Sequence, residues 1–414
     1  MNDADIKLKL LGFDNISETS KIHDDLESLR SCTPIMCVGE SILDFHFSIF
    51  GGSQKPFKQG DRKVMSLDMY SRLEYDKKAQ KQCLKPAGIN FADIYKPYTG
   101  QDLTDKSLLV WRTGGIGDIL FIQPNLIHLK KQYPSCKITF CCSPVYFPLI
   151  NNWDCIDKFL NIPLDLSVFE QCDYHLTFEG VIERCHVAEK ENAYSLFSQW
   201  MGLDLPPEKL RPVLYTKKKN NKLARKILKQ KSVKEKKFIC LQVRASSPIR
   251  TPSTYVWIQM VSPLIEKGYD IVILDKPDME VHVDMFIKQF PEKLRRNIHN
   301  FCGVSTAIDM AVSFVNLSKM VIAPDSSLVH IAAALRIPVF GVYGPFTGNV
   351  RMSYYLKADW IDPVPSTVCK YGGKGCYLHG HNPCPFNVQG ASPCFNEIDF
   401  NLANDKILTL LDEK

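Results

Sequence analysis

The sequence has no apolar run that approaches the ~20 residues a membrane-spanning helix needs. Its first residues, MNDADIKLKLLGFD, carry acidic side chains early and no long apolar stretch, unlike a secretory leader. The composition shows no strong bias, since 45% of the 414 residues are hydrophobic, 11% aromatic and 23% charged. These proportions exclude collagen, coiled coil and wholesale disorder. We therefore expect a soluble intracellular protein of two or three domains, without stable membrane insertion.

The fifteen cysteines include no Cys-x-x-Cys pair, the spacing that most strongly indicates a zinc or redox site. Eleven are scattered, several within apparent strands, where a thiol serves as a small buried hydrophobe. This usage is typical of a reducing compartment. The other four cluster in a turn-rich tail with two histidines: Cys369, Cys376, Cys384, Cys394, His379 and His381. For this tail, packed reduced thiols, a structural zinc and disulfides all remain open, whereas a catalytic zinc is not expected.

Positive charge is concentrated in one segment. Residues 217–237 contain eleven Lys or Arg and one Glu, a local charge of +10, so that the rest of the chain carries −4 of the total +6. A nucleic-acid binder usually has several basic surfaces, and this distribution does not favour one. A solvated helix face in a linker explains the segment. A landing site for an anionic acceptor, such as a phosphorylated glycan, a membrane surface or DNA, is the sharper alternative.

Apolar strands alternate with helical stretches in two series, which predicts an α/β protein with parallel sheets covered on both faces. The fold class we expect is two facing Rossmann-like domains with an N-terminal extension and a Cys-rich tail. The predicted boundaries are 1–104 for an accessory extension with small antiparallel hairpins, 105–216 for the first Rossmann-like domain, 217–237 for a basic linker, 238–362 for the second Rossmann-like domain, and 363–414 for the tail and a C-terminal helix.

The first candidate site is a glycine-rich turn between a strand at 107–112 and a helix. Gly114, Gly115 and Gly117 permit a tight turn with positive φ and let a ligand approach the backbone. Their spacing is not that of a dinucleotide fingerprint. Asp118 follows the carboxyl end of the strand, where ligands bind in open α/β sheets. It could take a proton from a hydroxyl nucleophile, or it could simply cap the helix.

The second candidate site spans 323–330, between another strand and helix. Its hydroxyls and the backbone N–H groups of a helix N-terminus form a site suited to a diphosphate. Asp325 could instead be an N-cap, and His330 could lie in the core. Another small-residue turn, which contains Gly344, ends the next strand. Arginines in the loop after the strand at 238–244 could grip phosphate oxygens or remain exposed. The candidate residues are Asp325, Ser326, Ser327, Leu328, His330, Gly344, Arg244 and Arg250.

Two segments carry a resemblance to a known family. The segment WRTGGIGDILFIQPNLIHLKKQYP and the segment APDSSLVHIAAALRIPVFGVYGP are similar to the opening and the nucleotide-site segments of the heptosyltransferases, glycosyltransferase family 9. The resemblance covers roughly 105–362 and implies the GT-B fold, with the acceptor on the first Rossmann-like domain and the nucleotide-sugar on the second. Two positions depart from the family pattern: Ser327 replaces a usual glycine, and Phe346, followed by Thr347, replaces a usual threonine.

The resemblance implies an inverting, metal-independent transfer of a heptose-like sugar from a nucleotide-diphosphate donor to a glycan or lipid-linked acceptor. An ADP-sugar is the favoured donor, and no cofactor is required for catalysis. The implied location is cytoplasmic, at most peripheral at the inner membrane face. Asp118 matches the family's general base, and the backbone at 326–328 matches its diphosphate site. Asp325, Ser326, Ser327 and His330 match its nucleotide-sugar segment. The candidate glycines for binding the nucleotide-sugar are Gly114, Gly115, Gly117 and Gly344. Arg244 or Arg250 corresponds to a basic residue that faces the phosphates.

Three alternatives remain open at this point. A nucleotide-sugar epimerase of the same fold would need further acid and base groups, for which Glu179, Glu183 and His186 are candidates. A non-catalytic glycan- or nucleotide-binding module would not depend on Asp118. A glycosyltransferase that acts on modified DNA would explain the basic segment.

Overall fold

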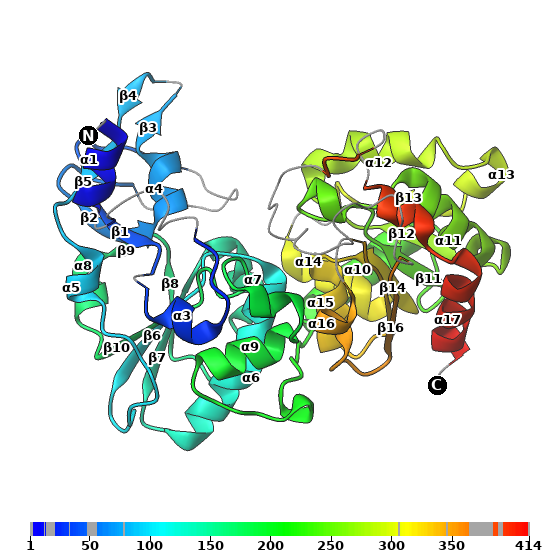
Figure 1. The fold of residues 1–414 in the computed structure, drawn as a ribbon. Coiled ribbons are helices and arrows are strands. Elements are labelled where there is room, and N and C mark those ends of the chain that lie inside the picture. The colour runs from blue at the N-terminus through cyan, green and yellow to red at the C-terminus, as the bar shows by residue number, and fades with distance from the viewer. Residues whose placement is uncertain are drawn as a thin grey trace. The chain divides into compact units, whose positions relative to one another are not determined.

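The computed structural model describes residues 3–11, 13, 21–32, 34–47, 56–77, 79–304, 307–344, 347–363, 384–387 and 392–412. The chain forms two compact units, each shown in Figure 1. Unit 1 comprises Met1–Ala188 and Ala193–Pro206, and unit 2 comprises Glu189–Asn192 and Pro207–Lys414. Each unit contains its own parallel sheet, which confirms the predicted α/β class.

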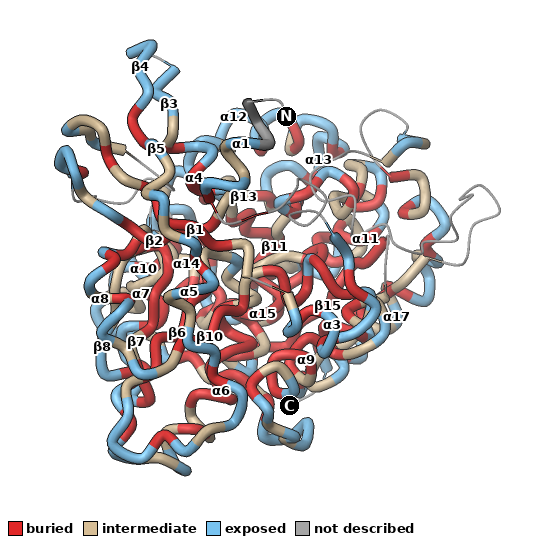
Figure 2. Tube along the Cα trace, turned by 60° about the vertical axis from the view of Figure 1, so that its left-hand side comes forward, coloured by how far each residue is buried: buried red, intermediate tan, exposed pale blue. Residues whose placement is uncertain are grey.

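The parallel sheet of unit 1 has the strand order β10-β6-β7-β8. Its strands are β6 (Ser107–Trp111), β7 (Lys137–Cys142), β8 (Lys158–Asn161) and β10 (Tyr174–Thr177). The connections contain α6 (Ile116–Gln132), η1 (Pro144–Tyr146), α7 (Phe147–Ile150) and α8 (Leu166–Glu170), and α9 (Ala193–Trp200) packs on α6. Most residues of β6 and β7 are buried, and buried residues are red in the tube of Figure 2. Their apolar runs therefore reflect a sheet covered on both faces.

The N-terminal extension builds a second sheet in unit 1, with the order β5-β1-β2-β9. Its strands are β1 (Met36–Ser41), β2 (Arg62–Ser66), β5 (Leu84–Pro86) and β9 (Leu164–Asp165), and each neighbouring pair is antiparallel. The predicted antiparallel pairing is thus confirmed, but β9 comes from outside the extension. Short elements complete the region: α1 (Asp3–Leu10), α3 (Leu26–Arg30), α4 (Leu67–Leu73), α5 (Phe91–Ile94), and the exposed hairpin of β3 (Tyr75–Asp76) and β4 (Lys81–Gln82).

The extension shares its core with the parallel sheet. One buried cluster joins Val64 and Tyr70 of the extension to Leu109 and Trp111 of β6 and to Phe169 of α8. Leu109 and Trp111 are alternate residues of a strand and therefore lie on the same face of the sheet. The extension thus covers that face, so it is part of unit 1 rather than an independent module.

The sheet of unit 2 is wholly parallel, with the order β13-β12-β11-β14-β15-β16. Its strands are β11 (Phe238–Leu241), β12 (Asp270–Ile273), β13 (Ile298–Asn300), β14 (Met320–Pro324), β15 (Val339–Val342) and β16 (Ala358–Ile361). Counted from β11, this is the doubly wound order in which strands are added first on one side and then on the other. Ligands in such sheets bind at the carboxyl ends of the strands where the order reverses, here β11 and β14.

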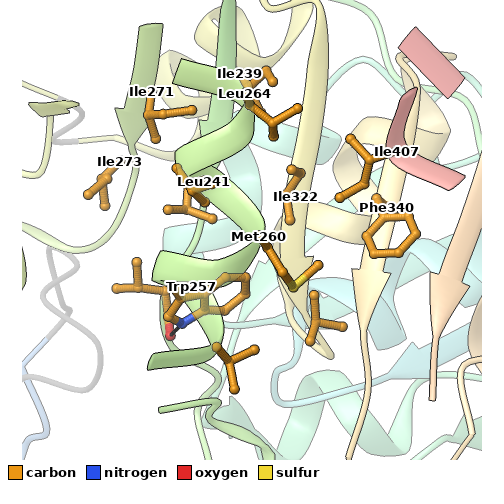
Figure 3. Close-up of a cluster of buried hydrophobic side chains, with 14 of the residues drawn as sticks. Ile239, Leu241, Trp257, Met260, Leu264, Ile271, Ile273, Ile322, Phe340 and Ile407 are labelled. Atoms are coloured by element: carbon orange, nitrogen blue, oxygen red, sulfur yellow. Dashed lines mark hydrogen bonds between the residues drawn. The ribbon is translucent and has the colours of Figure 1, made fainter. Parts of the chain in front are cut away.

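Helices cover both faces of this sheet. Leu241 of β11, Ile322 of β14 and Phe340 of β15 belong to one large core, which also contains Trp257 and Met260 of α11 and is shown in Figure 3. The elements of unit 2 are η3 (Pro207–Lys209), α10 (Lys218–Gln230), η4 (Pro248–Arg250), α11 (Thr254–Glu266), η5 (Pro277–Met279), α12 (Glu280–Ile287), α13 (Glu292–Arg295), α14 (Ile308–Leu317), α15 (Ser327–Ala334), α16 (Asn349–Met352), η7 (Pro393–Glu397) and α17 (Phe400–Asp412), while η2 (His186–Glu189) lies at the boundary of the two units.

Two segments differ in place from the predicted boundaries. Residues 217–237, expected to be a linker, contain α10, which packs on α14 within unit 2 and buries Ala224 and Leu228. The C-terminal helix α17, expected in a separate tail, contributes Ile407 and Leu410 to the main core of unit 2. Both segments are therefore structural parts of the second Rossmann-like unit.

Candidate functional site

The glycine-rich turn of unit 1 places Asp118 in the first turn of α6, beside the carboxyl end of β6. Gly115 is the N-cap residue of the helix and has a φ of 86°. A Cβ at this position would lie 2.0 Å from Asp118 Oδ2. Gly115 must therefore be glycine for both its backbone angle and the space that the Asp118 carboxylate occupies. Positive φ, predicted for three glycines, occurs here at Gly115 alone of the three, and Gly117 lies inside the helix.

Arg112 is buried and holds this turn together. Its Nη2 donates to Asp118 Oδ2 at 2.5 Å and to Glu183 Oε1 at 2.5 Å. Its Nε donates to the Gly114 carbonyl at 2.9 Å, and its Nη1 to the Phe178 carbonyl at 2.8 Å. Burial opposes the charge, but Asp118, Glu183 and Glu179 outweigh it and raise the pKa of Arg112 well above its usual range. The guanidinium is thus a permanent cation that links the glycine turn to the segment after β10.

The two glutamates considered for an epimerase belong to this same arrangement. Glu179 accepts a hydrogen bond from the Thr113 backbone N–H, and burial raises the pKa of its carboxyl even though Arg112 opposes the shift. Glu183 is an ion-pair partner of Arg112. His186 is exposed, and its backbone N–H donates to the His23 carbonyl. The carboxylates therefore serve to neutralise and orient Arg112.

The second site lies where β14 ends and α15 begins. Asp325 is buried, and its Oδ2 accepts from Arg250 Nη1 at 2.5 Å. Burial favours the neutral carboxyl, but Arg250, Arg351 and a hydrogen bond from Arg250 outweigh it, so that the pKa of Asp325 lies below its ordinary value. Ser326, rather than Asp325, is the N-cap of α15, and it makes no side-chain capping bond. Asp325 thus anchors the loop that carries Arg250.

The backbone at the start of α15 faces a polar side chain from the end of β11. Ser326 Oγ donates to Gln242 Oε1 at 2.7 Å, and the Leu328 N–H donates to the same oxygen at 3.4 Å. Ser327 is the first residue of the helix and is only partly buried. The carboxyl ends of β11 and β14 thereby bring hydroxyls and helix N–H groups together, an arrangement suited to an anion.

His330 lies in the core rather than at a surface. Its Nδ1 is 2.5 Å from the Tyr355 hydroxyl, and burial lowers the pKa of the imidazole to about 4. Asp325 opposes this shift, but not enough to reverse it. The ring is consequently neutral near pH 7 and acts as a hydrogen-bonding support for the start of α15.

The two candidate arginines differ in their surroundings. Arg250 bonds Asp325 and also donates from Nη2 to Ser246 Oγ at 2.8 Å, whereas Arg244 is exposed, with Nη1 3.1 Å from Met279 Sδ. Of the two, only Arg250 is joined to the β14–α15 junction. Gly344 lies against Phe395 of η7, where an added Cβ would come within 2.4 Å of the ring. Gly344 therefore permits close packing of the C-terminal segment.

The predicted metal ligands fall mainly outside the described residues. Cys369 and Cys376 are not described, and Cys384 and Cys394 are partly buried. Within the described ranges, no group of three or more His, Cys, Asp or Glu side chains is arranged to hold a metal ion.

Several important residues were not identified from the sequence. Arg112, Gln242, Arg351 and Tyr355 support the two sites. Only Arg112 had a recognisable signal, a charged residue directly after an apolar strand that is buried on both faces. Among the described helices, none combines the length and apolar content required to cross a bilayer.

Comparisons with known proteins find a family match over the middle and later part of the chain. Residues 183–356 match the family model described as glycosyltransferase family 9 (heptosyltransferase). Lipopolysaccharide heptosyltransferase 2 of Escherichia coli is 26% identical over 146 residues, which cover 32% of this chain and 42% of the relative. Lipooligosaccharide heptosyltransferase 2 of Haemophilus influenzae is 28% identical over 116 residues, which cover 28% of this chain and 33% of the relative. The chain thus spans less than half the length of these curated relatives.

Solved structures extend the likeness of fold to most of the chain. Escherichia coli ADP-heptose lipopolysaccharide heptosyltransferase II has a TM-score of 0.55 at 17% identity and covers 74% of this chain and 98% of that one. A family 9 glycosyltransferase from Veillonella parvula has a TM-score of 0.57 at 13% identity, with 76% and 99% covered. TibC, a dodecameric iron-containing heptosyltransferase solved with ADP-D-β-D-heptose, has a TM-score of 0.53 at 15% identity, with 86% and 83% covered. The fold is that of GT-B glycosyltransferases.

Replacing Gly115 by alanine is expected to lower the free energy of unfolding more than the same change at Gly202. Both residues have positive φ, 86° and 72°, which costs an L-residue about 1–2 kcal/mol. No atom lies within 4 Å of a Cβ at Gly202, whereas at Gly115 the Cβ would displace the Asp118 carboxylate from Arg112. Urea unfolding midpoints of the two variants test this comparison. Equal losses would mean that the carboxylate is not fixed in place.

Arg250→Met is expected to destabilise the protein by about 3 kcal/mol at pH 7, because it removes one partner of a buried ion pair. Asp325 is charged in the folded protein because its pKa is lowered. The stabilisation is therefore present above the ordinary pKa of an aspartate, about 4, and is lost as pH falls through the lowered value. In the variant, burial favours the neutral carboxyl, so the deficit should shrink between pH 7 and about pH 4.5.

Urea unfolding of Arg250→Met at both pH values measures this change. Arg244→Met removes the same charge from an exposed neighbour and should change stability by less than about 0.5 kcal/mol at either pH. A deficit in Arg250→Met that stays constant with pH would contradict the role given to Asp325.

Proposed function

Because residues 183–356 match the family model of glycosyltransferase family 9, the heptosyltransferases, we propose that this chain transfers a heptose-like sugar from a nucleotide-diphosphate donor to a hydroxyl of a lipopolysaccharide-type acceptor. Two relatives named heptosyltransferase 2 support this sugar and acceptor. The structural neighbour TibC, solved with an ADP-heptose, supports ADP as the nucleotide.

One observation carries the proposal: each unit has an ion pair at its candidate site with one member buried and the other more exposed. The more exposed member is the carboxylate in unit 1 and the guanidinium in unit 2. In unit 1 the Arg112 side chain is 5% exposed and Asp118 is 22% exposed. In unit 2 the Asp325 side chain is 6% exposed and Arg250 is 27% exposed. Unit 1 therefore presents a carboxylate, as a base for an acceptor hydroxyl requires, and unit 2 presents a guanidinium, as a diphosphate requires.

The proposed reaction is a single displacement with inversion. Asp118 accepts the proton of the acceptor hydroxyl while that oxygen forms a bond to the anomeric carbon of the donor. The bond from this carbon to the diphosphate oxygen breaks, and the nucleoside diphosphate leaves with the electron pair. Positive charge on the anomeric carbon and the ring oxygen grows in the transition state, which resembles an oxocarbenium ion as in glycoside chemistry generally.

Unit 2 would stabilise the departing diphosphate. The backbone N–H groups at 326–328 and the Arg250 guanidinium supply positive charge where the negative charge develops. The Leu328 N–H bond to Gln242 is long, 3.4 Å, and a phosphate oxygen would replace it. We propose that this charge makes a catalytic metal unnecessary and that Gly114, Gly115, Gly117 and Gly344 shape the turns around the donor.

Nucleotide binding gives the first test of the donor site. Thermal unfolding of the full chain without added metal, with ADP, GDP, UDP or CDP, should show stabilisation by ADP above the others. A ligand that binds only the native state contributes about 2.7 kcal/mol at a hundredfold excess over Kd. Stabilisation by none of the four would contradict a nucleotide-sugar site, and preference for another would replace ADP in the proposal.

Asp118→Asn is expected to lower the rate of heptose transfer about 10³-fold, because a general base contributes about 10²–10⁴-fold. Affinity for the nucleotide should stay unchanged, since the groups proposed to hold its phosphates, the backbone at 326–328 and Arg250, lie in unit 2. Transfer is measured with an ADP-heptose and a heptose-truncated lipopolysaccharide, with mass spectrometry of the product. Asp93→Asn, an exposed aspartate in α5, is the matched control and should keep full activity. Turnover retained in Asp118→Asn would contradict the proposed base.

We further propose that Cys369, Cys376, Cys384 and Cys394 hold a structural metal ion through four thiolates, a donor set suited to zinc or iron. Two observations support it: the clustering of the four residues in the sequence and the description of the neighbour TibC as iron-containing. Metal analysis of the purified protein should find about one equivalent, lost in Cys384→Ser and kept in Cys32→Ser. Absence of metal from the wild-type protein would contradict the proposal.

A cytoplasmic location is the remaining part of the proposal. Of the eleven cysteines in residues 1–304, nine are buried as small apolar side chains. Such thiols are stable in a reducing compartment, where a nucleotide-sugar donor would also be available.

A further inference from the structure

The basic segment, residues 217–237, contributes no residue to either candidate site. Of the eleven cationic residues in 217–237, ten are lysines and one is Arg225. Helix α10 turns one side towards α14, where Ala224 and Leu228 are buried. At 100° per residue, the positions opposite these two form a continuous stripe along the helix.

Five lysines occupy that stripe: Lys218, Lys219, Lys222, Lys226 and Lys229. All five are exposed, and within the described residues none of them forms an ion pair. Neighbouring cations outside the stripe are paired, Lys217 with Asp309 and Arg225 with Glu235. The two cations with ion-pair partners are thus separate from these five lysines, for which the described residues provide no ion-pair partner. The name basic face is used below for the five lysines.

The border of the basic face carries apolar groups. Leu223 lies on the flank of the helix and is 45% exposed, and Tyr215, two residues before the N-cap of α10, is 73% exposed. The apolar side of α10 packs on α14, so only these border side chains could enter a lipid surface, beside lysines that anionic headgroups attract. Lysine stems also reach from such an edge to charged headgroups.

We propose that the basic face docks unit 2 on an anionic lipid surface. Five unpaired lysines on one stripe fit a plane of negative headgroups, which attracts each lysine near the surface. Nucleic acid fits less well, because phosphate and base recognition favours the bidentate arginine, and the chain outside 217–237 has a net charge of −4. This inference does not depend on the proposed transfer reaction.

Sedimentation of the full chain with vesicles tests the proposal. Binding is expected to vesicles of phosphatidylcholine containing phosphatidylglycerol and not to phosphatidylcholine alone, and it should weaken as salt is added because salt screens the charges. The variant K219Q/K222Q/K226Q/K229Q should partition at least ~10-fold more weakly. A matched variant, K77Q/K81Q/K131Q/K137Q, removes four exposed lysines from unit 1 and should change partitioning less than ~3-fold.

Leu223→Ser separates insertion from attraction, because it should weaken binding while leaving the salt dependence in place. Circular dichroism and thermal unfolding show whether each variant is folded. Equal binding to neutral and anionic vesicles would overturn the proposal, as would full binding by the α10 variant. Tighter binding to duplex DNA than to anionic vesicles, lost in the same variant, would reassign the face to nucleic acid.

Discussion

The geometry of unit 1 depends on one buried cation, Arg112, at the carboxyl end of β6. A guanidinium in the interior is costly unless several carboxylates and carbonyls compensate it. Asp118, Glu183 and Glu179 provide that charge, and the Gly114 and Phe178 carbonyls accept further hydrogen bonds. The turn, the start of α6 and the segment after β10 are therefore fixed together, and the Asp118 carboxylate has one defined position.

Unit 2 also has a buried charge at its candidate site, but there the buried group is an anion and its more exposed partner is a cation. There the buried member is the Asp325 carboxylate and the outer member is Arg250. His330, buried within α15, forms a hydrogen bond with the Tyr355 hydroxyl and remains neutral, which helps to fix the start of this helix. Two units of the same architecture thus present opposite charges at the carboxyl ends of their strands. This difference is what lets one unit serve an acceptor hydroxyl and the other a diphosphate in the proposed reaction.

Much of this could be predicted from the sequence. Apolar strand runs, followed by a glycine-rich turn after β6 and a serine-containing turn after β14, located these strands and their helices, because parallel sheets leave a strong local pattern. Three features could not be predicted. The sharing of a core between the extension and β6 depends on contacts between distant residues such as Tyr70 and Trp111. The choice of Arg250 over Arg244 depends on the path of a loop. The roles of Gln242 and Arg351 arise only when separate strands and helices meet.

The most direct measurement is the transfer rate of Arg112→Met, Asp118→Asn and the double variant, with thermal unfolding to show that each is folded. If Arg112 acts by holding Asp118, its single variant should lose much of the activity, and the double variant should be no slower than Asp118→Asn alone. Losses that multiply in the double variant would show independent roles and contradict the account of a carboxylate positioned by a buried arginine.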